Sequence, residues 1–342
     1  MTAVAPESTP DSTPDSVPAR AVRGGADGRR SWGVARSVLR VHRAALVVWT
    51  LAVIGLSGWL VWLTEAAAAT ERAAMEACDR AGQDWCDTTM GWTGYSPPVE
   101  WIGLLTGYLF LAVAAFAGSA LIGRELESGT ARLAWTQGVS PTRWLAAKLA
   151  VPALVVTVGA TALVLVYRWA WAANQDLMYN DWKAGSAFLS RGPTTVAYAL
   201  CALAVGTLIA LLLRRTLPAL AVSLAATGLL GYLVAQFRSS FWPALTVTST
   251  TQDVDRPDNA WELGNGAVIH GRRDPNFDIW QCDGTVAEGR RCLDDLGFSG
   301  TYVTYHPESH FWPLQLVESG VVLAVAAAAT TAAFLLVRRR TA

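Results

Sequence analysis

The sequence predicts an all-α polytopic membrane protein with six transmembrane helices, both chain ends in the cytoplasm and an extracytoplasmic cap between spans five and six. Of its 342 residues, 52% are hydrophobic and only 16% are charged, whereas a soluble domain carries about a quarter of charged residues. Six segments are apolar and long enough to cross the ~30 Å hydrocarbon core of a bilayer. The net charge of zero gives no indication of nucleic-acid binding. We therefore expect a multi-pass protein of the cell membrane.

The chain divides into five parts by composition. Residues 1–30 are rich in Pro, Ser, Thr, Asp and Gly, which predicts a disordered cytoplasmic tail. Residues 31–43 place valines and arginines on separate stripes at helical spacing, which predicts an amphipathic interfacial helix; a plain basic flank without a separate helix is the alternative. Spans one to five fill residues 44–236, residues 237–312 form the outer loop or cap, and residues 313–342 hold the sixth span and a basic cytoplasmic end. The predicted spans are 44–63, 101–122, 149–167, 194–213, 216–235 and about 314–337.

Charge and cysteine placement predict which loops face the cytoplasm. With the amino end inside, 16 of the 27 lysines and arginines fall on the inner side, as the positive-inside rule requires. Cys78 and Cys86 fall in the first outer loop, and Cys282 and Cys292 fall in the last one. Disulfides form outside the reducing cytosol, so we favour the pairs Cys78–Cys86 and Cys282–Cys292. Four cysteines allow three connectivities, and four free thiols are the remaining alternative.

The inner loop at residues 123–148 carries the most distinctive pattern. Glu125 and Glu127 stand at the membrane edge, and the Gly129-Thr130 pair interrupts the helix that precedes it. A new helix is expected to begin after Ser140, which suits an N-cap, because Pro141 suits a first helical position. The simpler interpretation is that the two glutamates only solvate a helix end.

This loop resembles a known family. Glu125, Gly129-Thr130, Ser140-Pro141, Arg143 and Lys148 resemble the E-x-x-x-G-T…P-x-x-R…K pattern of the type-2 permease (membrane subunit) class of ATP-binding cassette exporters. The resemblance implies a permease that couples ATP hydrolysis by a separate nucleotide-binding subunit to export, with a second permease copy or homologue beside it in the membrane lipid. It further implies that the loop docks on the ATPase subunit, which holds ATP and Mg, while this chain binds no cofactor. The coupling residues implied are Glu125, Glu127, Gly129, Thr130 and Arg143.

Other patterns bear on function less directly. Neither Lys148 nor Lys183 follows a glycine, so the chain lacks a phosphate-binding P-loop and we expect no enzymatic activity of its own. His306 and His310 lack a third metal ligand, and we predict no metal site. Glu318, at the start of the sixth span, is either a residue of the substrate pathway or an acid that faces water at the outer interface.

The long outer loop leaves a second function open. Its aromatic residues and its cysteine pair predict a small folded cap, whose role the sequence does not specify. The alternative to an exporter is therefore a non-transport polytopic membrane protein whose cap senses a ligand or organises partners. No residue selects a transported substrate.

Overall fold

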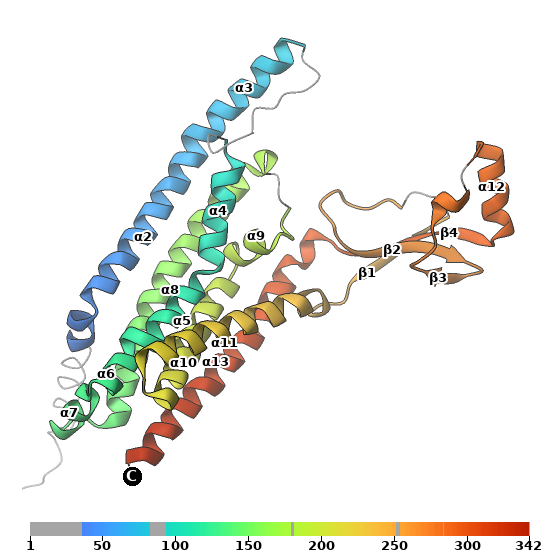
Figure 1. Ribbon diagram of the computed structural model, residues 1–342. Helices are drawn as coiled ribbons and strands as arrows, with labels where there is room; N and C mark the ends of the chain where they lie inside the picture. The colour runs from blue at the N-terminus through green and yellow to red at the C-terminus, as the bar shows by residue number, and fades with distance from the viewer. Residues whose placement is uncertain (1–35, 83–93, 179–180, 251–253, 283, 342) are drawn as a thin grey trace, which may run out of the picture.

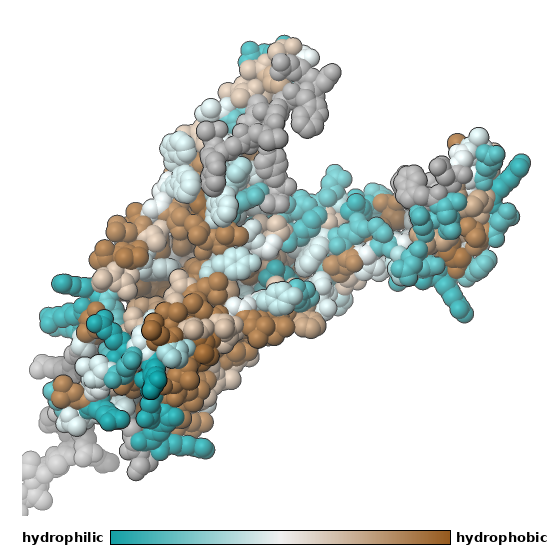
Figure 2. Space-filling view, in the orientation of Figure 1, coloured by the Kyte–Doolittle hydropathy of each residue, from teal (hydrophilic) through white to brown (hydrophobic). Residues whose placement is uncertain are grey.

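The computed structural model describes residues 36–82, 94–178, 181–250, 254–282 and 284–341. Within this part of the chain, six helices are long and apolar enough to cross a membrane, and each of them contains or overlaps one predicted span. Figure 1 shows them side by side in one bundle, with a small sheet projecting beyond one end. Figure 2 shows a broad apolar band over the bundle, with hydrophilic surface on the sheet and at the opposite end. The prediction of a six-span, mainly helical membrane protein is confirmed.

The first span is longer than expected. Residues 36–41 are helical, and after a turn at His42 the chain continues through α2 (Arg43–Trp62), the π-helical η1 (Leu63–Ala67) and α3 (Ala68–Arg80). These 38 residues extend about 57 Å at ~1.5 Å per residue, nearly twice the ~30 Å hydrocarbon core. The predicted span 44–63 therefore lies within a longer continuous helical segment that runs to Arg80. Alanine and glutamate, which favour helix, continue the helix beyond the apolar segment.

The second span consists of four short helical pieces, and the third is one long helix. The pieces are α4 (Ser96–Gly107), α5 (Leu109–Phe116), η2 (Ala117–Leu121) and α6 (Gly123–Glu127). A separate helix, α7 (Thr130–Thr136), precedes α8 (Pro141–Ala173). Ser140 caps α8 by accepting a hydrogen bond from the backbone N–H of Arg143 at 3.4 Å, as the sequence predicts.

The remaining spans are α10 (Thr194–Leu213), α11 (Thr216–Phe237) and α13 (Phe311–Thr341). α10 lies at the centre of the bundle and buries residues along most of its length. Gly206 permits this close packing, because a Cβ there would lie 3.0 Å from the carbonyl oxygen of Ala114. At the far end of α13, the guanidinium of Arg340 donates a hydrogen bond to the carbonyl of Leu211 at 2.7 Å. That contact satisfies a carbonyl in the last turn of α10.

The segment between α11 and α13 folds into the cap. Its sheet has the order β1-β4-β2-β3 with antiparallel neighbours, and α12 (Val286–Asp295) packs beside it. The strands are β1 (Leu245–Ser249), β2 (Trp261–Ile269), β3 (Arg272–Asp274) and β4 (Phe298–His306). Short helices lie between these elements at η4 (Arg238–Ser240), η5 (Ile279–Cys282) and η6 (Glu308–His310). The sequence predicts a folded cap but not its sheet.

The base of the cap rests on the connection between α8 and α10, which contains η3 (Gln175–Leu177) and α9 (Gly185–Ser190). The indole of Trp182 donates to the carbonyl of Asn259 at 2.7 Å and lies edge-on to the rings of Trp261 and Phe311. Lys183 donates to the carbonyl of Ala260 at 3.2 Å. The cap is therefore attached to the bundle by side-chain contacts as well as by its two chain connections.

Candidate functional site

The candidate functional site is the pair of short helices α6 and α7, at the end of the bundle opposite the cap (Figure 1). The two helices meet at Gly129, whose φ of 75° lies in the left-handed region that suits glycine. Thr130 closes the turn, because its hydroxyl donates to the backbone carbonyl of Glu125 at 3.3 Å. Gly129 and Thr130 therefore determine the turn between α6 and α7, and neither side chain is charged.

Glu125 belongs to a polar network between three segments of the chain. Its carboxylate accepts a hydrogen bond from the ammonium of Lys148 at 2.5 Å and another from the indole of Trp144 at 3.3 Å, both on α8. Lys148 is only 4% exposed, and its ammonium also lies 3.1 Å from Nε2 of His42, just before α2. The side chain of Glu125 is 20% exposed. It joins α6 to α8 and, through Lys148, to the beginning of α2.

The protonation of His42 follows from this geometry. An ammonium can only donate, so Nε2 of His42 must accept and the ring is neutral when it bonds Lys148. Burial lowers the pKa of His42 below its ordinary value of about 6.5, and the charge of Lys148 acts in the same direction. The nearby carboxylate of Glu125 opposes these effects. Neutral His42 is thus the form that fits the network.

Glu127 makes a second connection, to α11. Its carboxylate accepts a hydrogen bond from the backbone N–H of Thr216 at 2.8 Å and another from the hydroxyl of the same residue. Thr216 is the first residue of α11, where the backbone N–H groups have no partner within the helix. A carboxylate is favourable there for that reason and because of the helix dipole. α6 thereby contacts the start of α11 as well as α8.

The outward side of α7 is exposed. Leu133 is 59% exposed, and Arg132 and Thr136 beside it are exposed as well. Arg143 is half-buried in the first turn of α8. Of the residues that the resemblance assigns to coupling, Glu125, Glu127, Gly129 and Thr130 come together in the hairpin, and Arg143 lies at the following helix start.

Glu318 occupies a different place, buried between three helices. It is 0% exposed, and its carboxylate accepts two hydrogen bonds from Arg238, at 2.7 and 3.0 Å, and one from the hydroxyl of Tyr198 at 2.9 Å. The guanidinium of Arg238 also lies over the ring of Phe188, 4.3 Å from its centroid. The expectation that Glu318 faces water is wrong, because Arg238 neutralises it inside the protein. Whether it belongs to a substrate pathway stays a prediction.

Two cysteines and two histidines of the cap contact each other in pairs. Cys282 and Cys292 form a disulfide with sulfur atoms 2.00 Å apart, which joins η5 to α12. Cys86 lies outside the described residues, so the pairing Cys78–Cys86 stays a prediction. His306 and His310 contact each other through their Nδ1 atoms at 2.9 Å. No group of three or more His, Cys, Asp or Glu that could hold a metal occurs in the described ranges.

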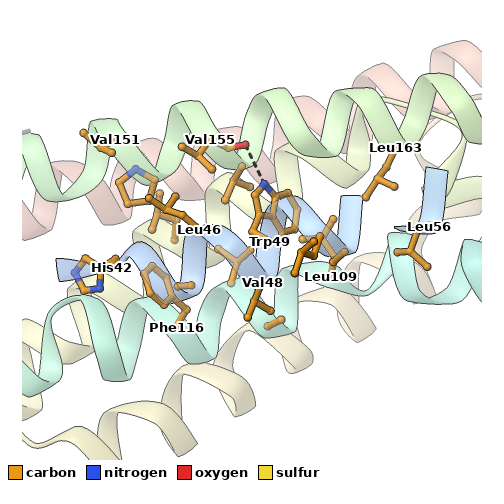
Figure 3. A pocket seen from close by; sticks show the side chains of 18 of the residues that line it. His42, Leu46, Val48, Trp49, Leu56, Leu109, Phe116, Val151, Val155 and Leu163 are labelled. Atoms are coloured by element: carbon orange, nitrogen blue, oxygen red, sulfur yellow. Dashed lines mark hydrogen bonds between the residues drawn. The ribbon is translucent and has the colours of Figure 1, made fainter. Parts of the chain in front are cut away.

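An apolar groove runs along the outside of the bundle. Its volume is about 690 Å³, and it lies between α2, α5 and α8. Figure 3 shows Trp49 of α2 inside it, donating to the carbonyl of Val155 on α8 at 3.3 Å. His42, the residue that contacts Lys148, lines one end of the groove. This groove could not be predicted from the sequence, because it arises from the spacing of three helices far apart along the chain.

Several residues of these sites were not predicted as site residues. Thr216, Tyr198 and His42 carry no sequence signal beyond their places at helix ends or within spans. Arg238 could have been found, because an acid inside a membrane span calls for a cation as partner, and Arg238 lies just beyond the predicted fifth span, 216–235.

Comparison with known proteins identifies the family. A sequence model of the family described as "ABC-2 membrane transporter related" matches residues 50–238, which is more than half of the chain. No curated protein and no solved structure gave a significant match. The family indicates the permease subunit of an ABC transporter, a non-enzymatic multi-pass membrane subunit that works with an ATPase partner. The chain belongs to the ABC-2 membrane transporter related family.

Proposed function

We propose that this chain is the permease subunit of an ATP-driven exporter and that the α6–α7 hairpin couples it to the nucleotide-binding subunit. Two permease chains and two ATPase subunits would form the transporter, with ATP and Mg held by the ATPase. The α7 end then faces the cytoplasm, in agreement with the distribution of arginine. The observation that carries the proposal is the double connection of α6 through Glu125 and Glu127.

The two connections explain how a force on the hairpin would reach the spans. Glu125 bonds Lys148 on α8, and Glu127 bonds Thr216 at the start of α11. Both are charge-assisted hydrogen bonds, which are stronger than neutral ones. A displacement of α6 by the ATPase would therefore move the ends of two membrane helices together.

The docking surface that we propose is the exposed side of α7. Leu133 supplies an apolar contact that is 59% exposed, and Arg132 supplies a positive charge next to it. Apolar and arginine side chains at the centre of a small patch are common anchors of protein interfaces. In this division of roles, Leu133 binds the ATPase, whereas the glutamates transmit its movement.

Substitutions on α7 and on α6 test the two roles separately. The full-length chain is purified from membranes together with its ATPase. Leu133→Asp should lower the ATP hydrolysis activity that co-purifies with the chain at least tenfold, which corresponds to a loss of ~1.4 kcal/mol in binding free energy. Val286→Asp is the matched control, because Val286 is 81% exposed on α12 of the cap. Glu127→Gln should leave capture unchanged and lower the ATP hydrolysis rate per captured ATPase.

The outcomes distinguish the parts of the proposal. If Leu133→Asp and Val286→Asp retain equal amounts of ATPase, α7 is not the docking surface. If Glu127→Gln hydrolyses ATP and transports at the wild-type rate, the connection from α6 to α11 does not transmit the movement. Absence of any ATPase from the wild-type preparation under conditions that preserve the complex would argue for the non-transport alternative.

A further inference from the structure

The groove between α2, α5 and α8 is lined by hydrocarbon along most of its length. Apart from His42, Trp49 and Thr106, every lining side chain belongs to Gly, Ala, Pro, Val, Leu or Phe. Its volume of about 690 Å³ lies in the range of roughly 300–1,000 Å³ that is typical of small-molecule sites. Apolar cavities of this kind exclude water. In a bilayer, the groove must therefore be filled by something apolar.

Trp49 lines the groove and contacts α8 across it. Its ring packs against Gly159, where a Cβ would lie 2.5 Å from the indole nitrogen. The same nitrogen donates to the carbonyl of Val155 (Figure 3). Only 6% of the most apolar 18-residue segment of the first span is buried inside the protein. Contacts such as those of Trp49 therefore hold α2 against the rest of the bundle. The groove beside Trp49 is partly open to the surroundings of the protein.

The stretch of chain beside one end of the groove is basic. His42 lines it there, and the exposed residues Arg40 and Arg43 lie on either side of His42 in the chain. No Asp or Glu occurs from residue 36 to residue 64. Lys148 is engaged by Glu125, which leaves Arg40 and Arg43 to attract an anion. Exposed basic residues close in sequence to the residue that lines the end of an apolar groove suit an anionic lipid headgroup at the membrane surface.

We propose that this groove binds an acyl chain of one anionic phospholipid, whose phosphate contacts Arg40 and Arg43 in the leaflet on the α7 side. The apolar lining selects a lipid chain over a polar solute, and the arginines select the sign of its headgroup. The groove shares His42 with the network of Glu125 and Lys148 but contains none of the coupling residues themselves, and the proposal stands whether or not the chain transports.

Gly55 and Gly58 provide a matched pair of variants. Both lie on α2, and a Cβ at either would meet no atom within 4 Å, but only Gly55 lines the groove. The full-length protein is reconstituted with equal phosphatidylglycerol and phosphatidylcholine, extracted into detergent and analysed for retained phospholipid by mass spectrometry. Gly55→Phe should lower the retained phosphatidylglycerol at least fivefold, whereas Gly58→Phe should retain the wild-type amount. Thermal unfolding of the two variants verifies that both are folded.

A second pair of substitutions tests the headgroup. Arg40→Gln combined with Arg43→Gln should lower the preference for phosphatidylglycerol over phosphatidylcholine at least fivefold. Retention of the wild-type lipid by folded Gly55→Phe would overturn the site. An unchanged headgroup preference in the double variant would overturn the role of the arginines. Loss of dimers in Gly55→Phe without loss of lipid would assign the groove to a second copy of the chain and would also overturn the proposal.

Discussion

Removing Arg238 should destabilise the protein strongly, because it would leave a buried carboxylate without its cation. In Arg238→Met, Glu318 stays 0% exposed and keeps only the hydrogen bond from Tyr198 at 2.9 Å. The variant loses two charge-assisted hydrogen bonds, at 2.7 and 3.0 Å, and the contact with the ring of Phe188. Breaking a buried ion pair by removing one partner costs about 3–5 kcal/mol.

The partner substitutions should follow a graded order. Tyr198→Phe removes one hydrogen bond to a charged group and should cost about 1.5–3 kcal/mol. Glu318→Gln leaves the guanidinium without a counter-charge, although the ring of Phe188 remains 4.3 Å away, so its cost should fall below that of Arg238→Met. The double variant Arg238→Met/Glu318→Leu removes both charges and should be more stable than Arg238→Met alone.

Equilibrium unfolding of the full-length chain in lipid bilayers or mild detergent measures these differences. The double-mutant cycle over Arg238 and Glu318 isolates the interaction between the two side chains. A loss below 1 kcal/mol for Arg238→Met would refute the assignment of a dry, buried pair. A double variant that loses as much stability as the sum of the two single variants would show that the side chains do not interact.

Three further predictions concern His42, the cap and the hairpin. The pKa of His42 is lowered in the folded protein, so its neutral form stabilises the fold above about pH 6.5, and this contribution is lost as the pH falls through the folded pKa. The melting temperature of the wild type should therefore fall more between pH 7.5 and pH 5.5 than the melting temperature of His42→Gln. Cys282→Ser should destabilise the cap by about 3 kcal/mol, seen as faster proteolysis between α11 and α13, since the disulfide closes a loop with a sequence separation of 10. Gly129→Ala should cost about 1–2 kcal/mol in thermal unfolding, because its φ is 75°, whereas Gly185→Ala, which has open space and no positive φ, should cost less.

The span count could be predicted because lipid imposes a simple rule on sequence. Each span needs about 20 apolar residues in a helix, which satisfies their backbone hydrogen bonds. Such a run of apolar residues can be recognised in the sequence without knowledge of the rest of the fold. Helix ends outside the hydrocarbon follow different rules, so the extension of the first span through α3 was missed. The cap sheet depends on pairing strands β2 and β4, which are separated by 28 residues, 270–297. Such pairing is not readable from one short window.

The candidate site was predictable only in its local part. The turn at Gly129 and the cap at Ser140 depend on neighbouring residues, and both occur as the sequence indicates. The partners of Glu125, Glu127 and Glu318 come from other helices, at separations of 23, 89 and 80 residues for Lys148, Thr216 and Arg238. The sequence shows that a buried acid requires a partner, but tertiary packing decides which one.

Polar contacts at its two ends connect α11 to the α6–α7 hairpin and to α13. Its first residue, Thr216, is bonded by Glu127 of the hairpin, and Arg238, directly after its last residue, is bonded to Glu318 of α13. α13 in turn continues from β4 of the cap through η6. If the hairpin couples the chain to an ATPase as we propose, a displacement of α6 would reach the base of the cap through α11 and α13. In the coupling that we propose, the Arg238–Glu318 pair would link α11 to α13, and the double-mutant cycle measures the strength of that link.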